Sequence, residues 1–244
     1  MKLLILFGDV ATKAKDTNAA IDFYSRAVKF GTRLLDISPN DIILLASLAH
    51  PLNKAGLSAL SNGDCVTAEK YLSEAVTIIH RMADVNGMFK REYAFTLTKL
   101  GTAKEEMDKL DEALQCYTTA MQITKELLAA SPDDGKLKYN MSVSYEQIGH
   151  IAELKHNYRE AELLYRQSLE ICRTNVKLGT RPFDEDALAS SLYRLGALPL
   201  QRKATYKQKE CLKEAMSIWK DLYNTTGDIV YKKNYDFAKK ALRR

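Results

Sequence analysis

The side chains best spaced for acid–base chemistry lie around His150. Glu146 stands four residues before this histidine and Glu153 three residues after it, so all three would share one face of a helix. A His–Glu pair of this kind could transfer a proton, but on helices it is more often a surface ion pair. No nucleophile and no glycine-rich phosphate loop accompanies it in the sequence. We therefore predict that the protein has no catalytic residues and is not an enzyme.

The spacing of cysteines and histidines argues against metal binding. Neither residue type forms a Cys-x-x-Cys or His-x-x-x-His pair. The sequence thus predicts no metal site, no cofactor and no disulfide framework, and reduced cysteines fit a cytoplasmic protein. The residues concerned are Cys65, Cys116, Cys172 and Cys211, with His50, His80, His150 and His156.

The charge balance is mildly basic. The 244 residues include 36 lysines and arginines against 31 acidic residues, which gives a net charge of +5. Basic residues concentrate toward the C-terminus, but acidic residues lie among them, as on a solvated helix face with a basic tail. A nucleic-acid binder would show a more concentrated basic stripe. We therefore do not expect nucleic acid as the partner.

The sequence also gives no sign of membrane association. No apolar run approaches the roughly 20 residues of a membrane-spanning helix. The apolar stretch of the opening Met1–Phe7 segment covers five residues. That is shorter than the roughly 7–15 residues of a signal-peptide core. We expect these residues to be part of the fold.

Five glycines recur at nearly constant spacing and reveal an internal repeat. They are separated by 48, 45, 48 and 47 residues, and a small or helix-compatible residue follows each of them by 12 and by 19 positions. Small residues at such positions let two helices approach closely where they cross. We expect one continuous array, in which each unit packs on its neighbours and the protein presents a binding surface. The glycines are Gly8, Gly56, Gly101, Gly149 and Gly196.

Apolar residues follow a helical period in every unit, and no β-type alternation competes with it. The pattern predicts an all-α protein in which each unit is a pair of helices. Pro199 should end or kink one of these helices, and Gln208 replaces alanine at the crossing that follows, so we expect looser packing there. The predicted pairs span 2–15 and 18–37, 41–61 and 64–85, 88–107 and 110–130, 134–155 and 158–177, and 184–202 and 205–224, with a last helix at 229–242.

This pattern resembles the tetratricopeptide repeat (TPR). Tyr24, Tyr117 and Tyr165 follow their glycines by 16 positions, and a large apolar residue stands four positions before each glycine. The family's repeat has 34 residues, whereas the spacing here is 45–48. About seven further residues in each helix, nearly two turns, would keep the inner face in phase.

The resemblance implies a right-handed α-solenoid of antiparallel helix pairs, a TPR-like superhelix. It would form a single domain over residues 1–244. The units would cover about 1–40, 41–87, 88–133, 134–181 and 182–227, with a C-terminal capping helix at 228–244.

In TPR proteins the first helix of each pair lines the concave face, where partners often bind. In this sequence that role falls on mostly polar positions. Lys54, Lys99 and Arg194 would pair with acidic groups of the ligand. The alternative is that these side chains are merely the solvated sides of amphipathic helices. The candidates are Asn53, Lys54, Leu57, Arg91, Thr98, Lys99, Thr102, Tyr139, Glu146, His150, Tyr193 and Arg194.

The resemblance favours a non-enzymatic interaction module or scaffold, cytoplasmic and bacterial, which binds a protein or peptide segment on its concave face. A second hypothesis is a peptide-sensing regulatory segment of a larger bacterial protein, because the first predicted helix is short. RNA binding would need a basic inner face, which Asp9, Glu92, Glu105 and Glu146 interrupt. The partner's identity and the oligomeric state stay open.

Overall fold

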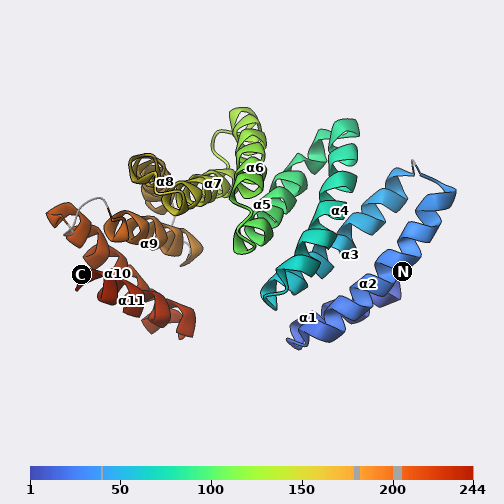
Figure 1. Cartoon of the computed structure of the whole chain (residues 1–244), viewed down its shortest axis with the longest axis horizontal. Helices are drawn as coiled ribbons and strands as arrows, with labels where there is room; N and C mark the ends of the chain where they lie inside the picture. The colour runs from blue at the N-terminus through green and yellow to red at the C-terminus, as the bar shows by residue number, and fades with distance from the viewer. Residues whose placement is uncertain (40, 179–181, 200–204, 244) are drawn as a thin grey trace. The chain divides into compact units, whose positions relative to one another are not determined.

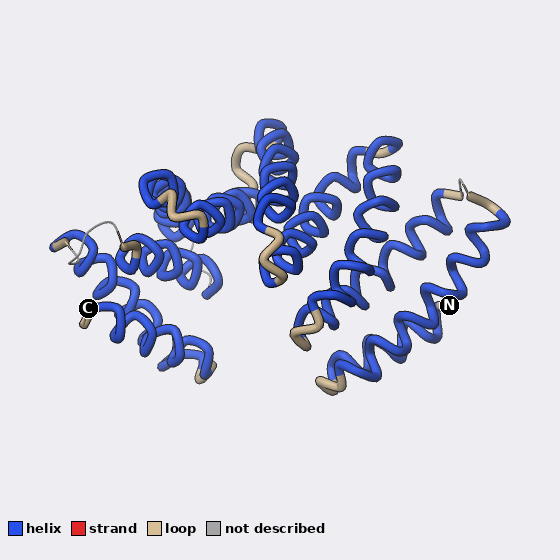
Figure 2. The backbone as a smooth tube through the Cα atoms, viewed as in Figure 1, coloured by secondary structure: helices blue, strands red, loops and turns tan. Residues whose placement is uncertain are grey.

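The computed structural model describes residues 1–39, 41–178, 182–199 and 205–243, which are helical apart from short connections (Figure 1 and Figure 2). The predicted all-α class is confirmed. The chain divides into two compact units, residues 1–123 (unit 1) and residues 124–244 (unit 2), and the division falls within one long helix. Each unit is described by itself.

The helices follow one another with short turns between them. Unit 1 contains α1 (Lys2–Lys13), α2 (Thr17–Ile37), α3 (Ile42–Ser61), α4 (Cys65–Val85), the 3₁₀ helix η1 (Gly87–Phe89), α5 (Lys90–Glu106) and the first part of α6 (Leu110–Ala130). Unit 2 contains the rest of α6, α7 (Gly135–Leu154), α8 (Tyr158–Leu178), α9 (Pro182–Ala197), α10 (Tyr206–Thr226) and α11 (Ile229–Leu242).

Aspartate side chains mark where many of these helices begin. At each position the carboxylate accepts a hydrogen bond of 2.9–3.1 Å from a backbone N–H two or three residues ahead. These N–H groups have no partner within the helix, so the cap stabilises the first turn. The capping residues are Asp16, Asp41, Asp64, Asp134 and Asp228.

The five repeated glycines lie where the two helices of a pair cross, as predicted. A Cβ atom at Gly101 would stand only 2.5 Å from Cε1 of Tyr117, and one at Gly149 would stand 2.8 Å from Cε1 of Tyr165. Atoms cannot approach so closely, so each glycine provides the space that the facing tyrosine ring fills. Consecutive helices within each unit pack as antiparallel pairs around these crossings (Figure 1).

The buried tyrosines of the crossings also tie the paired helices together through their hydroxyl groups. Tyr24 donates a 2.7 Å hydrogen bond to Oδ1 of Asp9, and Tyr165 donates one of 2.7 Å to Oε2 of Glu153. Burial raises the pKa of Tyr24 to about 12, so the hydroxyl stays protonated and can donate. Each ring therefore fills its crossing without leaving a buried polar atom unsatisfied.

Proline ends the first helix of the last pair, as predicted, but earlier than expected. Helix α9 ends at Ala197, two residues before Pro199, whereas the sequence suggested a helix to residue 202. The residue before a proline is driven out of the helical region, which accounts for the shorter helix. Residues 200–204 lie outside the described part of the chain.

The expectation of looser packing at Gln208 is wrong. A Cβ atom at Gly196 would stand 2.6 Å from Cγ of Leu212, as close as at the other crossings. The amide of Gln208 is accommodated by hydrogen bonds: Nε2 donates to the carbonyl of Leu198 at 2.6 Å, and Oε1 accepts from the backbone N–H of Thr205 at 2.9 Å. The glutamine thus completes a capping box at the start of α10.

The last helix, α11, packs on the other helices of unit 2. Its inner stripe of Tyr231, Tyr235, Ala238 and Leu242 packs on the apolar cluster that contains Trp219. Trp219 is only 2% exposed, so α11 shields a large aromatic side chain from water, a substantial apolar contribution.

Candidate functional site

In unit 1 the side chain of the candidate Asn53 forms hydrogen bonds with another helix of the fold. It is 8% exposed. Its Nδ2 donates to Oε1 of Glu92 at 3.3 Å, and its Oδ1 accepts from the hydroxyl of Thr96 at 3.1 Å. The side chain therefore joins α3 to α5, and this contact between helices accounts for a polar residue at this position.

The two candidate lysines of unit 1 also have partners nearby. Nζ of Lys54 lies 3.7 Å from Oδ1 of Asp9, and Nζ of Lys99 lies 5.5 Å from the centre of the Phe95 ring. Burial lowers the pKa of Lys99 because the charged ammonium loses hydration. The prediction that these lysines pair with acidic ligand groups stays a prediction.

The remaining candidates of unit 1 show no shared cavity among the described residues. The hydroxyl of Thr98 donates to the carbonyl of Ala94 at 2.9 Å, and that of Thr102 donates to the carbonyl of Thr98 at 3.1 Å. Leu57 is partly exposed and Arg91 is exposed. These side chains lie on the surface of α3 and α5 without forming a defined site.

In unit 2, three of the five candidates come together. Glu146 of α7 and both Tyr193 and Arg194 of α9 line one cavity of about 260 Å³. Side chains that the sequence did not single out as binding residues complete its walls. They are Ser190 of α9, Trp219 of α10, and Asn234 and Phe237 of α11.

The carboxyl group of Glu146 is held by two serines. Ser191 donates a short hydrogen bond to its Oε1, and Ser168 donates to the same oxygen at 3.4 Å. Burial raises the pKa of Glu146 to about 7, against the opposing effects of Ser191, Arg194 and Ser168, while Asp186 adds to the rise. The group thus changes its charge near neutral pH.

Aromatic side chains form much of the rest of the cavity. The ring centres of Tyr193 and Trp219 lie 5.8 Å apart, and the indole Nε1 of Trp219 donates to Oδ1 of Asp186 at 2.8 Å. Phe237 is 60% exposed, so it stands at the open edge of the cavity. The hydrogen bond to Asp186 holds the indole in place.

Two polar side chains of the cavity wall are available to a ligand. Neither the guanidinium of Arg194 nor the amide of Asn234 makes a hydrogen bond to any residue that the structure describes, and Arg194 influences Glu146 only through its charge. Ligand sites usually combine aromatic walls with a few hydrogen-bond donors and acceptors that have no partner within the protein.

The other two candidates of unit 2 are not among the residues that line this cavity. The ring of Tyr139 packs edge-on against Phe183, with centres 5.3 Å apart and planes at 81°. Burial raises the pKa of its hydroxyl. His150 is partly exposed and has a partner of its own.

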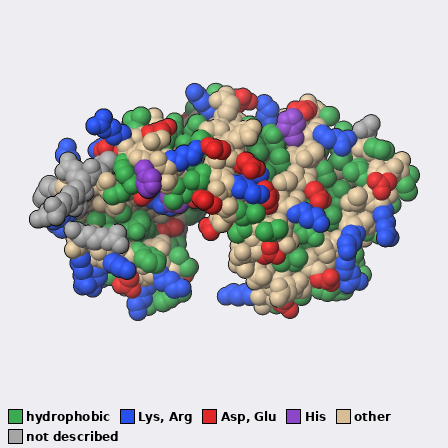
Figure 3. Space-filling view, viewed as in Figure 1, with side chains coloured by type: hydrophobic (Ala, Val, Ile, Leu, Met, Phe, Trp, Pro, Cys, Tyr) green, Lys and Arg blue, Asp and Glu red, His purple; other side chains and the backbone are tan. Residues whose placement is uncertain are grey.

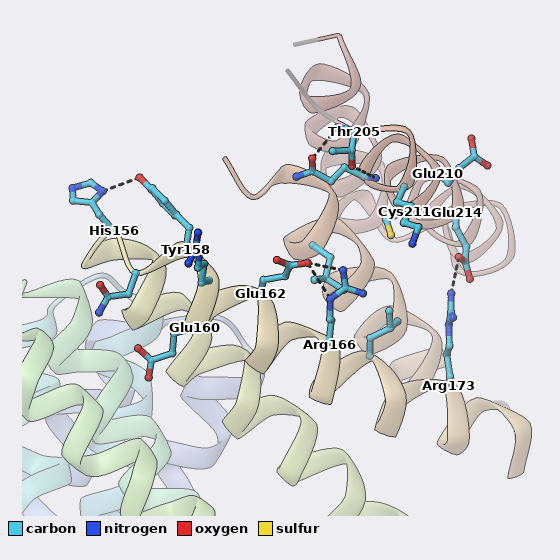
Figure 4. A pocket seen from close by; sticks show the side chains of 16 residues that line it. His156, Tyr158, Glu160, Glu162, Arg166, Arg173, Thr205, Glu210, Cys211 and Glu214 are labelled. Carbon is cyan, nitrogen blue, oxygen red and sulfur yellow. Dashed lines mark hydrogen bonds and ion pairs between the residues drawn. The ribbon is translucent and has the colours of Figure 1, made fainter. Parts of the chain in front are cut away.

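A larger hollow lies between the second helices α8 and α10 (Figure 4). Its volume is about 1360 Å³, but several of its charged side chains pair with one another. Arg173 bridges the two helices by a 3.1 Å contact with Glu214, and Arg166 binds Glu162 one turn away on α8. Most side chains that line this hollow are polar or charged, whereas three aromatic rings line the smaller cavity.

The surface and the described helices carry few signs of other functions. On the face that Figure 3 shows, basic and acidic side chains are interspersed over the described residues. In the same described ranges no three metal-ligating side chains gather. None of the described helices is both long and apolar enough to span a bilayer.

Comparison with known proteins identifies the repeats. Residues 92–174 match the family model "Tetratricopeptide repeat". No curated protein sequence matches the chain closely enough to count as a relative. The match identifies residues 92–174 as tetratricopeptide repeats, and the same glycine crossings and helix pairs recur in the other described helices.

Solved structures agree on the fold. BtubC (BKLC) from P. vanneervenii aligns with a TM-score of 0.59 and 18% identity, over 92% of this chain and 90% of that protein. The apo form of RapI aligns with a TM-score of 0.65 and 13% identity, over 99% of this chain and 82% of RapI.

A further similar structure contains a peptide. It is the Rap conjugation gene regulator of the plasmid pLS20 in complex with the Phr* peptide, with a TM-score of 0.61 and 16% identity. The match covers 96% of this chain and 56% of that regulator. At such identities the likeness extends to the fold alone.

Proposed function

We propose that the protein is a peptide-binding interaction module, and that the cavity of unit 2 anchors one residue of the bound segment. The observation that carries this proposal is the convergence of Glu146, Tyr193 and Arg194 on one cavity with unpaired polar groups and aromatic walls. All three belong to first helices of their pairs, α7 and α9, the helices through which TPR proteins often bind their partners.

The size of the cavity suits an anchor residue. Pockets that enclose drug-sized ligands measure roughly 300–1,000 Å³, and this cavity of about 260 Å³ is slightly smaller. It would therefore hold one side chain, while the rest of the segment lies along the first helices. Binding of this kind needs no chemical step, in line with the prediction of a non-enzymatic protein.

A peptide-sensing regulatory segment remains the second candidate. It draws support from the fold shared with a regulator that was solved with a peptide. Both candidates require the same peptide site, so the first experiment tests them together. A cytoplasmic and bacterial setting stays part of the proposal.

The test is a selection of displayed random peptides against the whole chain. We expect the selected peptides to lose binding when Ser190→Trp fills the cavity, and to keep it in the control Ser217→Trp, which places the same ring on the exposed surface of α10. Phe237→Ala serves as a second cavity variant, since this exposed side chain contributes little to stability. Equal binding by all four proteins would refute the cavity as the anchor.

A further inference from the structure

We propose that the cavity of unit 2 takes a cationic side chain, an arginine or a lysine, of the bound peptide. The inference rests on the proposed function and names the chemistry of the anchored residue. It departs from the expectation, drawn from the sequence, that Arg194 pairs with an acidic group of the ligand.

The carboxylate of Glu146 is the counter-charge for such a ligand. Its Oε1 accepts hydrogen bonds from Ser191 and Ser168, while Oε2 accepts none from the residues that the structure describes. The serines therefore fix the carboxylate from one side and leave Oε2 for a donor from the cavity. Hydrogen bonds between a charged donor and a carboxylate are among the strongest in proteins.

The aromatic walls of the cavity also favour a positively charged ligand. Tyr193, Trp219 and Phe237 all line the cavity, and the electron-rich faces of such rings attract cations, most strongly where water is excluded. Their apolar surface also suits the aliphatic stem of an arginine or lysine. An anionic side chain would meet these rings without that attraction.

Among the described residues that line the cavity, Arg194 is the one group whose charge opposes a cation. It lowers the pKa of Glu146 by its charge, but it forms no ion pair with that carboxylate in the described part of the chain. Asp186, which accepts from the indole of Trp219, adds negative charge nearby. Among the described residues, the carboxyl groups of Glu146 and Asp186 therefore oppose the guanidinium of Arg194.

The raised pKa of Glu146 also favours a cationic ligand. Its pKa of about 7 reflects burial without a sufficient counter-ion, and a bound cation would supply one. Affinity for a cation should therefore rise as pH increases through neutrality. The titratable or charged groups that face Glu146 are Arg194 and Asp186 of α9, Tyr165 and Cys172 of α8, and Tyr139 of α7.

The chain offers a specific reporter for the test. Trp219 is its single tryptophan, and this residue lines the cavity. In a ¹⁵N-labelled sample of the whole chain, the indole N–H therefore gives one resonance at the site. We would titrate it with N-acetyl-arginine amide, its neutral isostere N-acetyl-citrulline amide, and N-acetyl-glutamate amide.

The expected result is a saturable shift with the arginine derivative at a dissociation constant on the order of 1 mM, and at least about tenfold weaker binding of the citrulline derivative. Binding of the arginine derivative should tighten between about pH 6 and about pH 8. A stronger response to the glutamate derivative, or equal responses to arginine and citrulline, would overturn the inference.

Two variants test the charges of Glu146 and Arg194 one at a time. Glu146→Gln should remove the preference for arginine over citrulline together with its pH dependence, whereas the exposed control Glu170→Gln should change neither. Arg194→Gln should strengthen binding of the arginine derivative, because a competing cation is removed. If Arg194→Gln instead weakens that binding, the cation is not the ligand of this cavity.

The outcomes also distinguish this inference from the proposed function. If selected peptides bind through the cavity but the arginine derivative behaves like citrulline, only the ligand chemistry is wrong. If no selected peptide depends on the cavity and no derivative shifts the indole resonance, both proposals fail.

Discussion

Replacing Glu146 by glutamine should make unit 2 more stable at alkaline pH and leave its stability at acidic pH nearly unchanged. The side chain is partly buried, and both of its serine partners can also bind an amide. Glutamine therefore keeps the size and the hydrogen bonds of the site, and it removes only the charge. The variant isolates the free energy of ionising a carboxyl group in this cavity.

The magnitude follows from the pKa. Glu146 has a pKa of about 7 in the folded chain, against an ordinary value of 4.5, and each tenfold difference corresponds to about 1.4 kcal/mol. Ionisation therefore costs the fold at most about 3.5 kcal/mol, and less where water reaches the carboxylate. Because the folded pKa is raised, the stability that the protonated carboxyl contributes is complete below pH 4.5 and is lost as pH rises through about 7.

The assay is urea denaturation followed by the fluorescence of Trp219, the single tryptophan and part of the same cavity. Wild type and Glu146→Gln should unfold at similar urea concentrations at about pH 5, and the variant should need more urea at about pH 8.5. The control Glu170→Gln changes an exposed carboxylate of α8 and should show no such divergence. A difference between wild type and Glu146→Gln that is the same at both pH values would refute the reasoning.

Three further changes test the packing. Gly101→Ala should lower the melting temperature, at a cost of about 1–3 kcal/mol, because the new Cβ would stand 2.5 Å from the facing tyrosine ring; an unchanged melting temperature would refute the assigned crossing. Gly227→Ala should cost about 1 kcal/mol in thermal denaturation, since φ is +71° there, whereas Gly87→Ala, with no positive φ, should be nearly neutral. Trp219→Phe should destabilise unit 2 in the same assay by about 1–3 kcal/mol, because it leaves the partly buried carboxylate of Asp186 without its donor. An unchanged melting temperature would show that this hydrogen bond does not stabilise unit 2.

The helix pairs could be predicted because their signals are local and repeated. Apolar residues at helical spacing and the repeated glycines placed most helix ends within two residues of those observed. The deviations arise from longer-range contacts. Gln208 was expected to loosen its pair, but its amide binds the carbonyl of Leu198, which a sequence pattern cannot reveal.

The candidate site could be predicted only in part. The alignment of repeats identified Glu146, Tyr193 and Arg194 as first-helix residues, and these line the cavity. Asn53 occupied an equivalent position, but its contacts with Thr96 and Glu92 draw it into the packing between helices. The position of a residue on the first helix indicates whether its side chain could contact a ligand. Its neighbours on other helices decide whether that side chain is available for binding.

The contribution of α11 was the least predictable part of the site. The resemblance implied a C-terminal capping helix, and α11 packs on the cluster that contains Trp219. Asn234 and Phe237 stand beside its inner stripe and close the cavity from the opposite wall. Their role depends on how the helix docks on α10, which follows from tertiary packing rather than from a local signal.

The most direct test of the peptide-anchoring account is photo-crosslinking with a selected peptide that carries benzoylphenylalanine next to its anchor residue. We predict that the crosslinks fall on α9 and α11, around Ser190 and Phe237, and that an excess of unlabelled peptide suppresses them. Crosslinks confined to the hollow between α8 and α10, or to unit 1, would contradict the account.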